Sequence, residues 1–165
     1  MIEAIGNIWD YHPTKDAVIV VPTNVGWKKN GENVMGAGIA KQAAVMFPNL
    51  PLWYGTYCEQ YREKAGVTFY WQDTDKAVPS LALVPTKALD EEKPWLSWQQ
   101  ESTMARVEQS LCEIHYLVEQ SNMKITIILP LLGCGNGGLD EKEVYPMMKV
   151  YLPEDNYILV REKRK

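Results

Sequence analysis

Two stretches of the chain are apolar at most positions instead of at every second one: DAVIVVPTN at 16–24 and KITIILPLLG at 124–133. A strand with one face in water alternates apolar and polar residues. A strand of a parallel sheet covered on both faces reads instead as a continuous apolar run. The two stretches therefore predict central strands of a sheet that has helices packed on each side.

The other expected elements alternate in type along the chain. In order, they are a strand at 2–9, helices at 36–47 and 50–66, strands at 67–73 and 80–87, helices at 97–122 and 140–152, and a strand at 156–163. This alternation is typical of the α/β class. We expect a three-layer α/β/α sandwich with a mixed, mostly parallel central sheet. The length of 165 residues suits a single domain over residues 1–165.

Composition argues against several classes of protein. The net charge is −4 and the sequence pI is about 5.3, whereas a broad nucleic-acid-binding face needs clustered Lys and Arg. No apolar run is long enough to span a membrane, and no signal peptide is evident. The three cysteines are odd in number and lack metal-site spacing. We expect a soluble, cytoplasmic protein without a bound metal.

A glycine-rich segment follows each of the two apolar strands. The first, VMGAGIAKQAAVMFP at 34–48, enters a helix on almost bare backbone. The second has four glycines in the six residues 133–138, which carries an entropic cost unless backbone shape matters. Successive N–H groups in such loops form anion-binding nests, although a tight turn is the alternative interpretation. Because ligands of α/β sheets bind beyond the carboxyl ends of the strands, both loops should meet at one phosphate-binding crevice.

Two better-known phosphate motifs do not fit. Gly133, Gly135 and Gly138 match G-x-G-x-x-G, but only one strand is expected after them, whereas a dinucleotide-binding fold needs several. Gly31 and Gly36 have the spacing of a Walker A loop, but Ala37 stands where that loop requires lysine.

Three ordered motifs resemble the macrodomain family, which binds ADP-ribose. They are VIVVPTN with VMGAGIAKQ, then PTK at 85–87 followed by Trp95 and Ser97, then LPLLGCGNGGL at 129–139. The resemblance covers nearly the whole chain. It is strongest with the branch that includes DNA ADP-ribosyl glycohydrolase antitoxins and terminal ADP-ribose protein glycohydrolase.

The resemblance implies a set of site residues. Lys87 would be catalytic: it would act beside the distal ribose as nucleophile or proton carrier, helped by a pKa that partial burial lowers. Asn24 would hydrogen-bond the distal ribose, although an Asx turn is the alternative. The implied ligand-binding residues are Asn7, Ile8, Asn24, Met35, Gly36, Ala37, Gly38, Ile39, Thr86, Gly133, Cys134, Gly135, Asn136, Gly137, Gly138 and Leu139.

The chain departs from the family pattern at several positions. Asn7 stands where the family has an aspartate that contacts adenine. Gly137 stands where human terminal ADP-ribose protein glycohydrolase has a catalytic aspartate. Asp140 is expected to cap a helix instead, and Cys134 to fill space without acting as a nucleophile. The segment ALDEEKP at 88–94 is more acidic than expected, which disfavours a DNA substrate.

The function expected from this resemblance is binding of ADP-ribose and hydrolysis of an ADP-ribosyl linkage. The alternatives are a non-catalytic ADP-ribose-binding module and an ADP-ribose 1''-phosphate phosphatase. No cofactor is expected. The partner would be ADP-ribose or an ADP-ribosylated substrate, with nucleic acid involved only if that substrate is ADP-ribosylated DNA. The protein would be a monomer, and whether the acceptor is protein, DNA or a small metabolite stays open.

Overall fold

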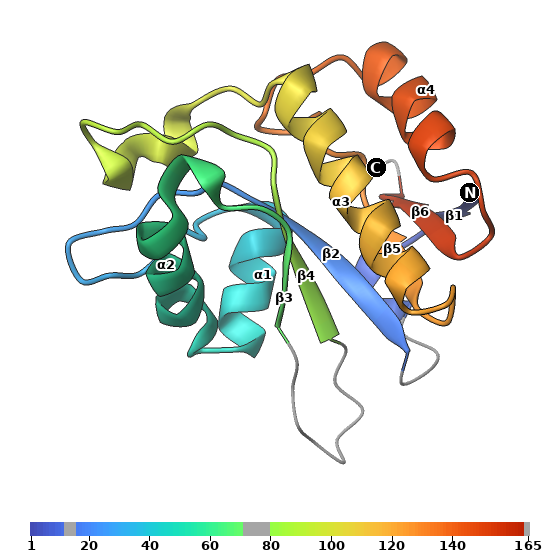
Figure 1. The fold of residues 1–165 in the computed structure, drawn as a ribbon, viewed down its shortest axis with the longest axis horizontal. Helices are drawn as coiled ribbons and strands as arrows, with labels where there is room; N and C mark the ends of the chain where they lie inside the picture. Colours follow the sequence, from blue (N-terminus) through green and yellow to red (C-terminus); the bar gives the residue numbers. More distant parts are fainter. Residues whose placement is uncertain (12–15, 71–79, 164–165) are drawn as a thin grey trace.

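The computed structural model describes residues 1–11, 16–70 and 80–163, and its centre is a six-stranded sheet (Figure 1). The strand order is β1-β6-β5-β2-β4-β3, and every neighbouring pair is parallel except β4 with β3. The bounds are β1 Ile2–Ile5, β2 Ala17–Thr23, β3 Thr68–Tyr70, β4 Ser80–Pro85, β5 Thr126–Leu129 and β6 Tyr157–Arg161. The expected mixed, mostly parallel sheet is confirmed.

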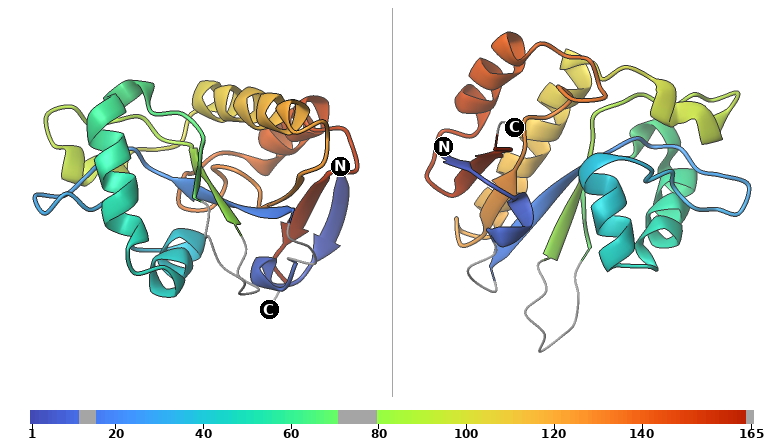
Figure 2. Two further views of the ribbon diagram at one scale, coloured as in Figure 1. Left: turned by 60° about the horizontal axis from the view of Figure 1, so that its bottom comes forward. Right: turned by 180° about the vertical axis from the view of Figure 1, so that it is seen from behind.

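Helices cover both faces of the sheet (Figure 2). The helices α1 (Gly38–Met46) and α2 (Leu50–Tyr61) lie on one face, and α3 (Met104–Gln120) and α4 (Glu141–Tyr151) lie on the other. Because successive side chains of a strand point to opposite faces, Ile19 and Val21 pack with the first pair, while Val18 and Val20 pack with the second. This double burial explains why the central strand β2 is apolar throughout, and the α/β/α sandwich is confirmed.

The first expected strand, 2–9, is too long by four residues. β1 ends at Ile5, because Gly6 adopts a φ of 151° and leaves the strand direction. The next residue, Asn7, caps a short 3₁₀ turn: its Oδ1 accepts a hydrogen bond from the backbone N–H of Trp9 at 3.0 Å.

The helix expected at 97–122 is wrong over its first seven residues. Pro94–Gln99 forms the separate 3₁₀ segment η3, after which the chain is largely extended up to Thr103. Thr103 caps α3 by accepting a hydrogen bond from the Arg106 N–H at 3.2 Å. Among the described helices, none is long and apolar enough to cross a lipid bilayer.

The other differences are smaller. The helix expected at 36–47 begins two residues late, at Gly38. The helix expected at 50–66 ends at Tyr61, because Arg62 has a φ of 54° and starts the 3₁₀ turn η2, Arg62–Lys64. Gly66 therefore does not close that helix. Of the strand expected at 67–73, residues 71–73 lie outside the described residues.

Candidate functional site

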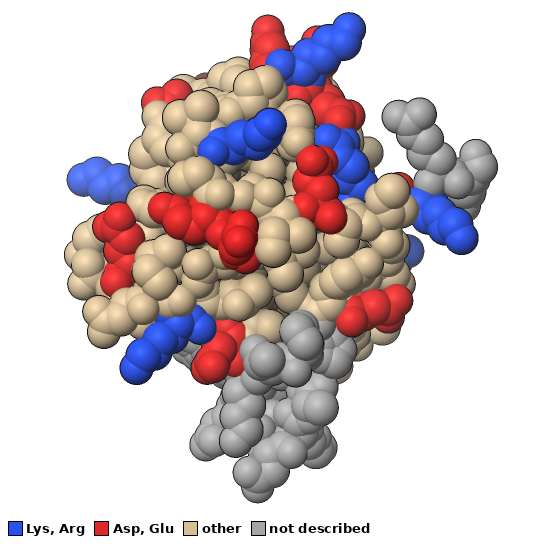
Figure 3. Space-filling view, turned by 90° about the vertical axis from the view of Figure 1, so that its right-hand side faces the viewer, with Lys and Arg blue, Asp and Glu red and all other residues tan. Residues whose placement is uncertain are grey.

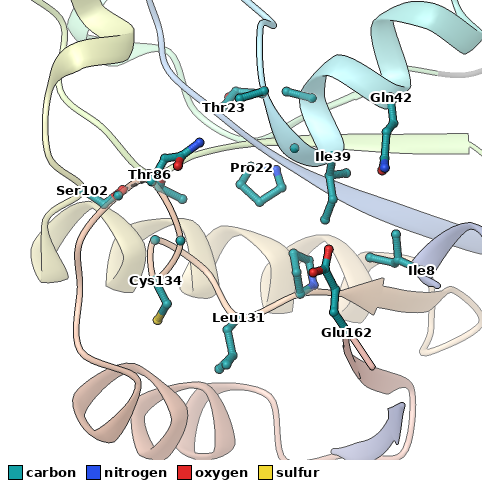
Figure 4. Close-up of a pocket in the computed structure, with 18 of the residues that line it drawn as sticks. Ile8, Pro22, Thr23, Ile39, Gln42, Thr86, Ser102, Leu131, Cys134 and Glu162 are labelled. Atoms are coloured by element: carbon teal, nitrogen blue, oxygen red, sulfur yellow. Dashed lines mark hydrogen bonds between the residues drawn. The ribbon is translucent and has the colours of Figure 1, made fainter. Parts of the chain in front are cut away.

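A wide cleft lies where the parallel strands end. Its volume is about 2210 Å³, more than the ~300–1,000 Å³ of a usual enclosed small-molecule pocket, so it is an open groove that accommodates an extended ligand. Residues from the carboxyl ends of β1, β2, β4, β5 and β6 line it (Figure 4). Both glycine-rich loops reach the same cleft, as expected for an α/β sheet.

Two asparagines fix the loop that follows β2. The Oδ1 of Asn24 accepts a hydrogen bond from the Gly26 N–H at 2.9 Å, which is an Asx turn, and its Nδ2 donates to the Val34 carbonyl at 2.9 Å. The Nδ2 of the buried Asn33 donates to the Gly26 carbonyl at 2.8 Å and to Asn24 Oδ1 at 3.1 Å. Asn24 lines the cleft, but these contacts tie its amide chiefly to its own loop.

Two glycines hold this loop against its neighbours. A Cβ on Gly55 of α2 would lie 1.9 Å from the Gly31 carbonyl oxygen, so only glycine lets the loop rest on that helix. A Cβ on Gly26 would lie 2.0 Å from the carbonyl oxygen of Pro94 and 2.7 Å from Ser97 Oγ. The loop is therefore clamped between α2 and η3 before the chain reaches α1.

At the end of this loop, where α1 begins, the backbone lines the cleft without covering side chains. Gly36, Ala37 and Gly38 are exposed and line the cleft, and the N-cap residue Ala37 offers no side-chain cap. A Cβ on Gly38 would have no atom within 4 Å, and Gly38 has a φ of 56°, which favours glycine. Uncapped N–H groups at a helix N-terminus attract anions, because they lack partners and carry the positive end of the helix dipole.

The second glycine loop faces the first across the cleft, and its glycines have different roles. A Cβ on Gly137 would lie 2.2 Å from Ser102 Oγ, and the Gly137 carbonyl accepts a hydrogen bond from the Ser102 N–H at 2.9 Å. A Cβ on Gly135 would point into open space. Gly133 and Gly138 turn the chain with φ values of 74° and 78°. Of these four, Gly135 is the one that both lines the cleft and has unoccupied space at its Cβ position.

Cys134 lies between two of these glycines, and Figure 4 shows its sulfur beside the cleft. Burial, with the negative charges of Glu141 and Asp140, raises the pKa of its thiol. A raised pKa keeps the sulfur protonated and poorly nucleophilic. Asp140 caps α4 as expected, since its Oδ1 accepts from the Lys142 N–H at 2.9 Å.

Lys87 lies just beyond β4 at the end of the cleft occupied by Ser102. Its Nζ donates a hydrogen bond to the Trp98 carbonyl at 2.7 Å, and burial lowers its pKa from the ordinary 10.5. Ser102 forms a backbone bridge with Lys87, and its Oγ donates to Thr86 Oγ1 at 3.1 Å. The ammonium is thus held in place at the cleft wall while part of its solvent shell is removed.

The structure brings together all but three of the residues implied by the sequence. Met35 is a core side chain, Leu139 packs against the core under α3 and α4, and Gly138 turns the loop, so none of the three lines the cleft. Those that line it are Asn7, Ile8, Asn24, Gly36, Ala37, Gly38, Ile39, Thr86, Lys87, Gly133, Cys134, Gly135, Asn136 and Gly137.

Several lining residues were not anticipated from the sequence, notably Ser102, Trp98, Gln42 and Glu162. Ser102 and Trp98 were hidden inside the helix expected at 97–122. The motif residue Ser97 has a structural role, because its Oγ accepts a hydrogen bond from the Asp90 N–H at 3.0 Å.

Charges outside the cleft are mixed. On the face that carries α4, described basic and acidic residues are interspersed (Figure 3). There Arg161 pairs with Glu3, Nε to Oε1 at 3.1 Å, and also with Glu141. Within the described ranges, no three His, Cys, Asp or Glu side chains gather closely enough to hold a metal ion.

No protein-family model matches the chain, but a curated protein and several solved structures are similar to it. The DNA ADP-ribosyl glycohydrolase of Thermus aquaticus is 32% identical over 116 residues, which is 70% of this chain and 30% of that protein. The chain thus corresponds to less than a third of that relative's length.

Solved structures extend the likeness to the whole fold. The macrodomain of Thermus aquaticus DarG superposes with a TM-score of 0.74 and 25% identity, covering 98% of this chain and 97% of that one. Thermosipho africanus DarTG in complex with ADP-ribose has a TM-score of 0.74 and 22% identity, covering 100% of this chain and 43% of that one. The macrodomain of Mycobacterium tuberculosis DarG has a TM-score of 0.72 and 22% identity, covering 98% and 99% of the two chains. From the ordered motifs and these likenesses in sequence and fold, we conclude that the chain belongs to the macrodomain family, in its DarG-like branch.

Proposed function

We propose that this macrodomain binds ADP-ribose in the cleft and hydrolyses an ADP-ribosyl linkage. Support for binding comes from the two backbone surfaces that face the cleft, one at Gly36–Gly38 and the other at Gly135. In this proposal, the diphosphate lies between them and accepts hydrogen bonds from their N–H groups. The distal ribose then extends toward Asn24 and Lys87.

Lys87 is the observation that carries the hydrolytic part of the proposal. A lysine whose pKa is lowered by burial supplies a neutral amine more readily than an exposed one, and this one is held by the Trp98 carbonyl at 2.7 Å. In one route, the neutral amine attacks the anomeric carbon while the bond to the acceptor breaks and the acceptor takes a proton from the amine. The resulting glycosylamine then opens to an imine, as the bond from the anomeric carbon to the ring oxygen breaks and that oxygen takes the remaining proton of the nitrogen. Water then hydrolyses the resulting imine and restores the amine. In the other route, the lysine relays protons between the ribose and an attacking water.

A non-catalytic ADP-ribose-binding module and an ADP-ribose 1''-phosphate phosphatase are the two alternative functions. The position of Lys87 favours hydrolysis over the module. The Thermus aquaticus DNA ADP-ribosyl glycohydrolase matches this chain over only 30% of its own length, so an ADP-ribosylated DNA substrate is a hypothesis for this chain. A protein, DNA or small-metabolite acceptor is compatible with the proposal.

The test is to incubate the protein with ADP-ribosylated protein, ADP-ribosylated DNA and ADP-ribose 1''-phosphate, and to measure which one is consumed. We expect release of ADP-ribose from one of the first two. Lys87→Ala should reduce this rate at least about a hundredfold, the scale of lost acid–base or nucleophilic help, while ADP-ribose affinity changes only a few-fold.

A matched control is Lys124→Ala, because Lys124 is exposed and precedes β5, at the end of the sheet opposite the cleft. It should leave both activity and affinity unchanged. Cyanoborohydride added during turnover should attach ADP-ribose covalently to Lys87 only in the imine route. A wild-type protein that binds ADP-ribose but consumes none of the three substrates would favour the binding module instead, and consumption of ADP-ribose 1''-phosphate alone would favour the phosphatase.

A further inference from the structure

Glu162 lies at the opposite end of the cleft from Lys87. It follows the last residue of β6, Arg161, and it lines the cleft. The Gly6 N–H donates to the Arg161 carbonyl at 2.9 Å, so the chain leaves β1 and β6 side by side. Asn7 and Glu162 therefore leave neighbouring strand ends and flank the same part of the cleft.

The carboxylate of Glu162 is not engaged by any described residue through a hydrogen bond or ion pair. Its neighbour Arg161 cannot readily neutralise it, because that guanidinium is committed to Glu3 and Glu141. Figure 4 shows the Glu162 carboxylate directed into the cleft toward Ile39, on the same side as Ile8 and away from Thr86 and Ser102. This end of the cleft therefore combines the apolar side chains of Ile8 and Ile39 with a carboxylate that has no described partner, and Arg161 and Lys163 line the cleft on either side of it in the sequence.

The chemistry of that end indicates which part of the ligand it accepts. A carboxylate repels a diphosphate, so the phosphates belong at the glycine loops and an uncharged group belongs beside Glu162. An ionised carboxylate only accepts hydrogen bonds. The apolar walls of Ile8 and Ile39 suit a flat ring, and the carboxylate suits a ring that carries an amine.

Asn7 supplies the complementary group. Its Oδ1 is occupied by the Trp9 N–H at 3.0 Å, which orients the amide so that Nδ2 is left to donate. No described residue accepts a hydrogen bond from that nitrogen. One donor beside one acceptor matches the edge of adenine, which presents an amine beside a ring nitrogen that accepts.

We propose that Glu162 selects adenine by accepting a hydrogen bond from its exocyclic amine, with Asn7 donating to the neighbouring ring nitrogen. The inference rests on the ADP-ribose binding proposed above. In the family, an aspartate at the position of Asn7 supplies a carboxylate to adenine. In this chain, we infer that Glu162, after β6, supplies that carboxylate instead. Hypoxanthine carries a carbonyl in place of the amine, and that carbonyl oxygen would face the carboxylate.

The test is to compare the calorimetric affinities of ADP-ribose and inosine diphosphate ribose for wild type, Glu162→Ala and Glu162→Gln. Wild type should prefer ADP-ribose at least about tenfold, the lower range for a hydrogen bond to a charged group. The preference should fall to about threefold or less in Glu162→Ala. It should fall likewise in Glu162→Gln, because an amide can present either a donor or an acceptor. Glu143→Gln, an equal charge change on α4 outside the cleft, should keep the wild-type preference.

The ratio of two affinities separates base recognition from general damage, since misfolding weakens both ligands alike. If wild type binds both ligands equally, or if both Glu162 variants keep the wild-type ratio, the role of Glu162 is refuted while ADP-ribose binding stands. If wild type binds neither ligand, the proposed function and this inference both fail.

Discussion

Gly135 and Gly137 are two residues apart in one loop, and the structure predicts opposite consequences for the same substitution to alanine. A Cβ on Gly137 would lie 2.2 Å from Ser102 Oγ and 2.5 Å from the Gly133 carbonyl oxygen. A Cβ on Gly135 would meet nothing within 4 Å, at a place where the residue lines the cleft. Gly137→Ala should therefore damage the fold, and Gly135→Ala should damage ligand binding.

The expected magnitudes follow from packing. Forcing a methyl group into a filled site costs about 1–3 kcal/mol, and each kcal/mol lowers the Tm of a domain this size by about 2–4 °C. Gly137→Ala should thus lower the Tm by about 2–12 °C. Gly135 is not at a positive φ, so alanine is tolerated there and can stabilise by up to about 1 kcal/mol through the unfolded chain. Its methyl group would project into the ligand's space and weaken ADP-ribose binding by about tenfold or more, or about 1.4 kcal/mol.

The assay is thermal unfolding of both variants without ligand, followed by calorimetry with ADP-ribose. A Gly137→Ala protein as stable as wild type would refute the packing argument. Normal ADP-ribose affinity in Gly135→Ala would refute close approach of this loop to the ligand. Because the two variants differ only in where one methyl group points, each is the control for the other.

Four further outcomes are expected. ADP-ribose should bind with micromolar or better affinity, near about −8 kcal/mol, and NAD more weakly in the same titration, because nicotinamide would crowd the distal ribose beside Lys87. Since burial lowers the pKa of Lys87, hydrolysis that needs its neutral amine should rise with pH with a midpoint below pH 10.5, and Lys87→Arg should be inactive throughout that pH series. The unfolded chain binds more protons than the folded one between the two pKa values, so this lysine's contribution to the free energy of unfolding should rise with pH across that window. At pH 8, iodoacetamide should modify the exposed Cys112 before Cys134, whose pKa is raised, as peptide mass mapping would detect.

Sequence patterns were most informative where burial acts on every residue of an element. Continuous apolar runs identified β2 and β5 because both faces of each strand are covered. The glycine loops could be placed at one crevice because parallel strands end at the same edge of a sheet. The tie between Asn24 and Asn33 could not be foreseen, since it joins residues nine apart through loop geometry that no periodicity encodes.

Ser102 is the largest omission at the site, and a local signal for it was present. Residues 97–103 contain no glycine or proline, so nothing in their composition interrupts a helix expected at 97–122. Thr103 stands directly before Met104, where an N-cap is expected, and Pro94 marks the start of a separate turn. If those two signals had been given priority, the predicted helix would have begun after Thr103, and Ser102 would have been predicted to lie in a loop near the cleft.

The errors in the strand ends share one physical origin. Each expected parallel strand continues past its observed end: β1 stops at Ile5 where 9 was expected, β4 at Pro85 where 87 was expected, and β5 at Leu129 where 133 was expected. The residues after these ends were assigned to strands because their sequence remains apolar or typical of extended backbone. The hydrogen-bonded ladder, however, ends where two neighbouring strands diverge, and the sequence of one strand does not show where that happens. Beyond that point the backbone N–H and C=O groups have no sheet partner and must find one elsewhere. Most of these residues line the cleft, as does Glu162 after β6, whereas Trp9 and Leu132 do not. In this α/β sheet, the ligand site is therefore formed largely by residues that the apolar pattern assigns to strands but that no neighbouring strand pairs with.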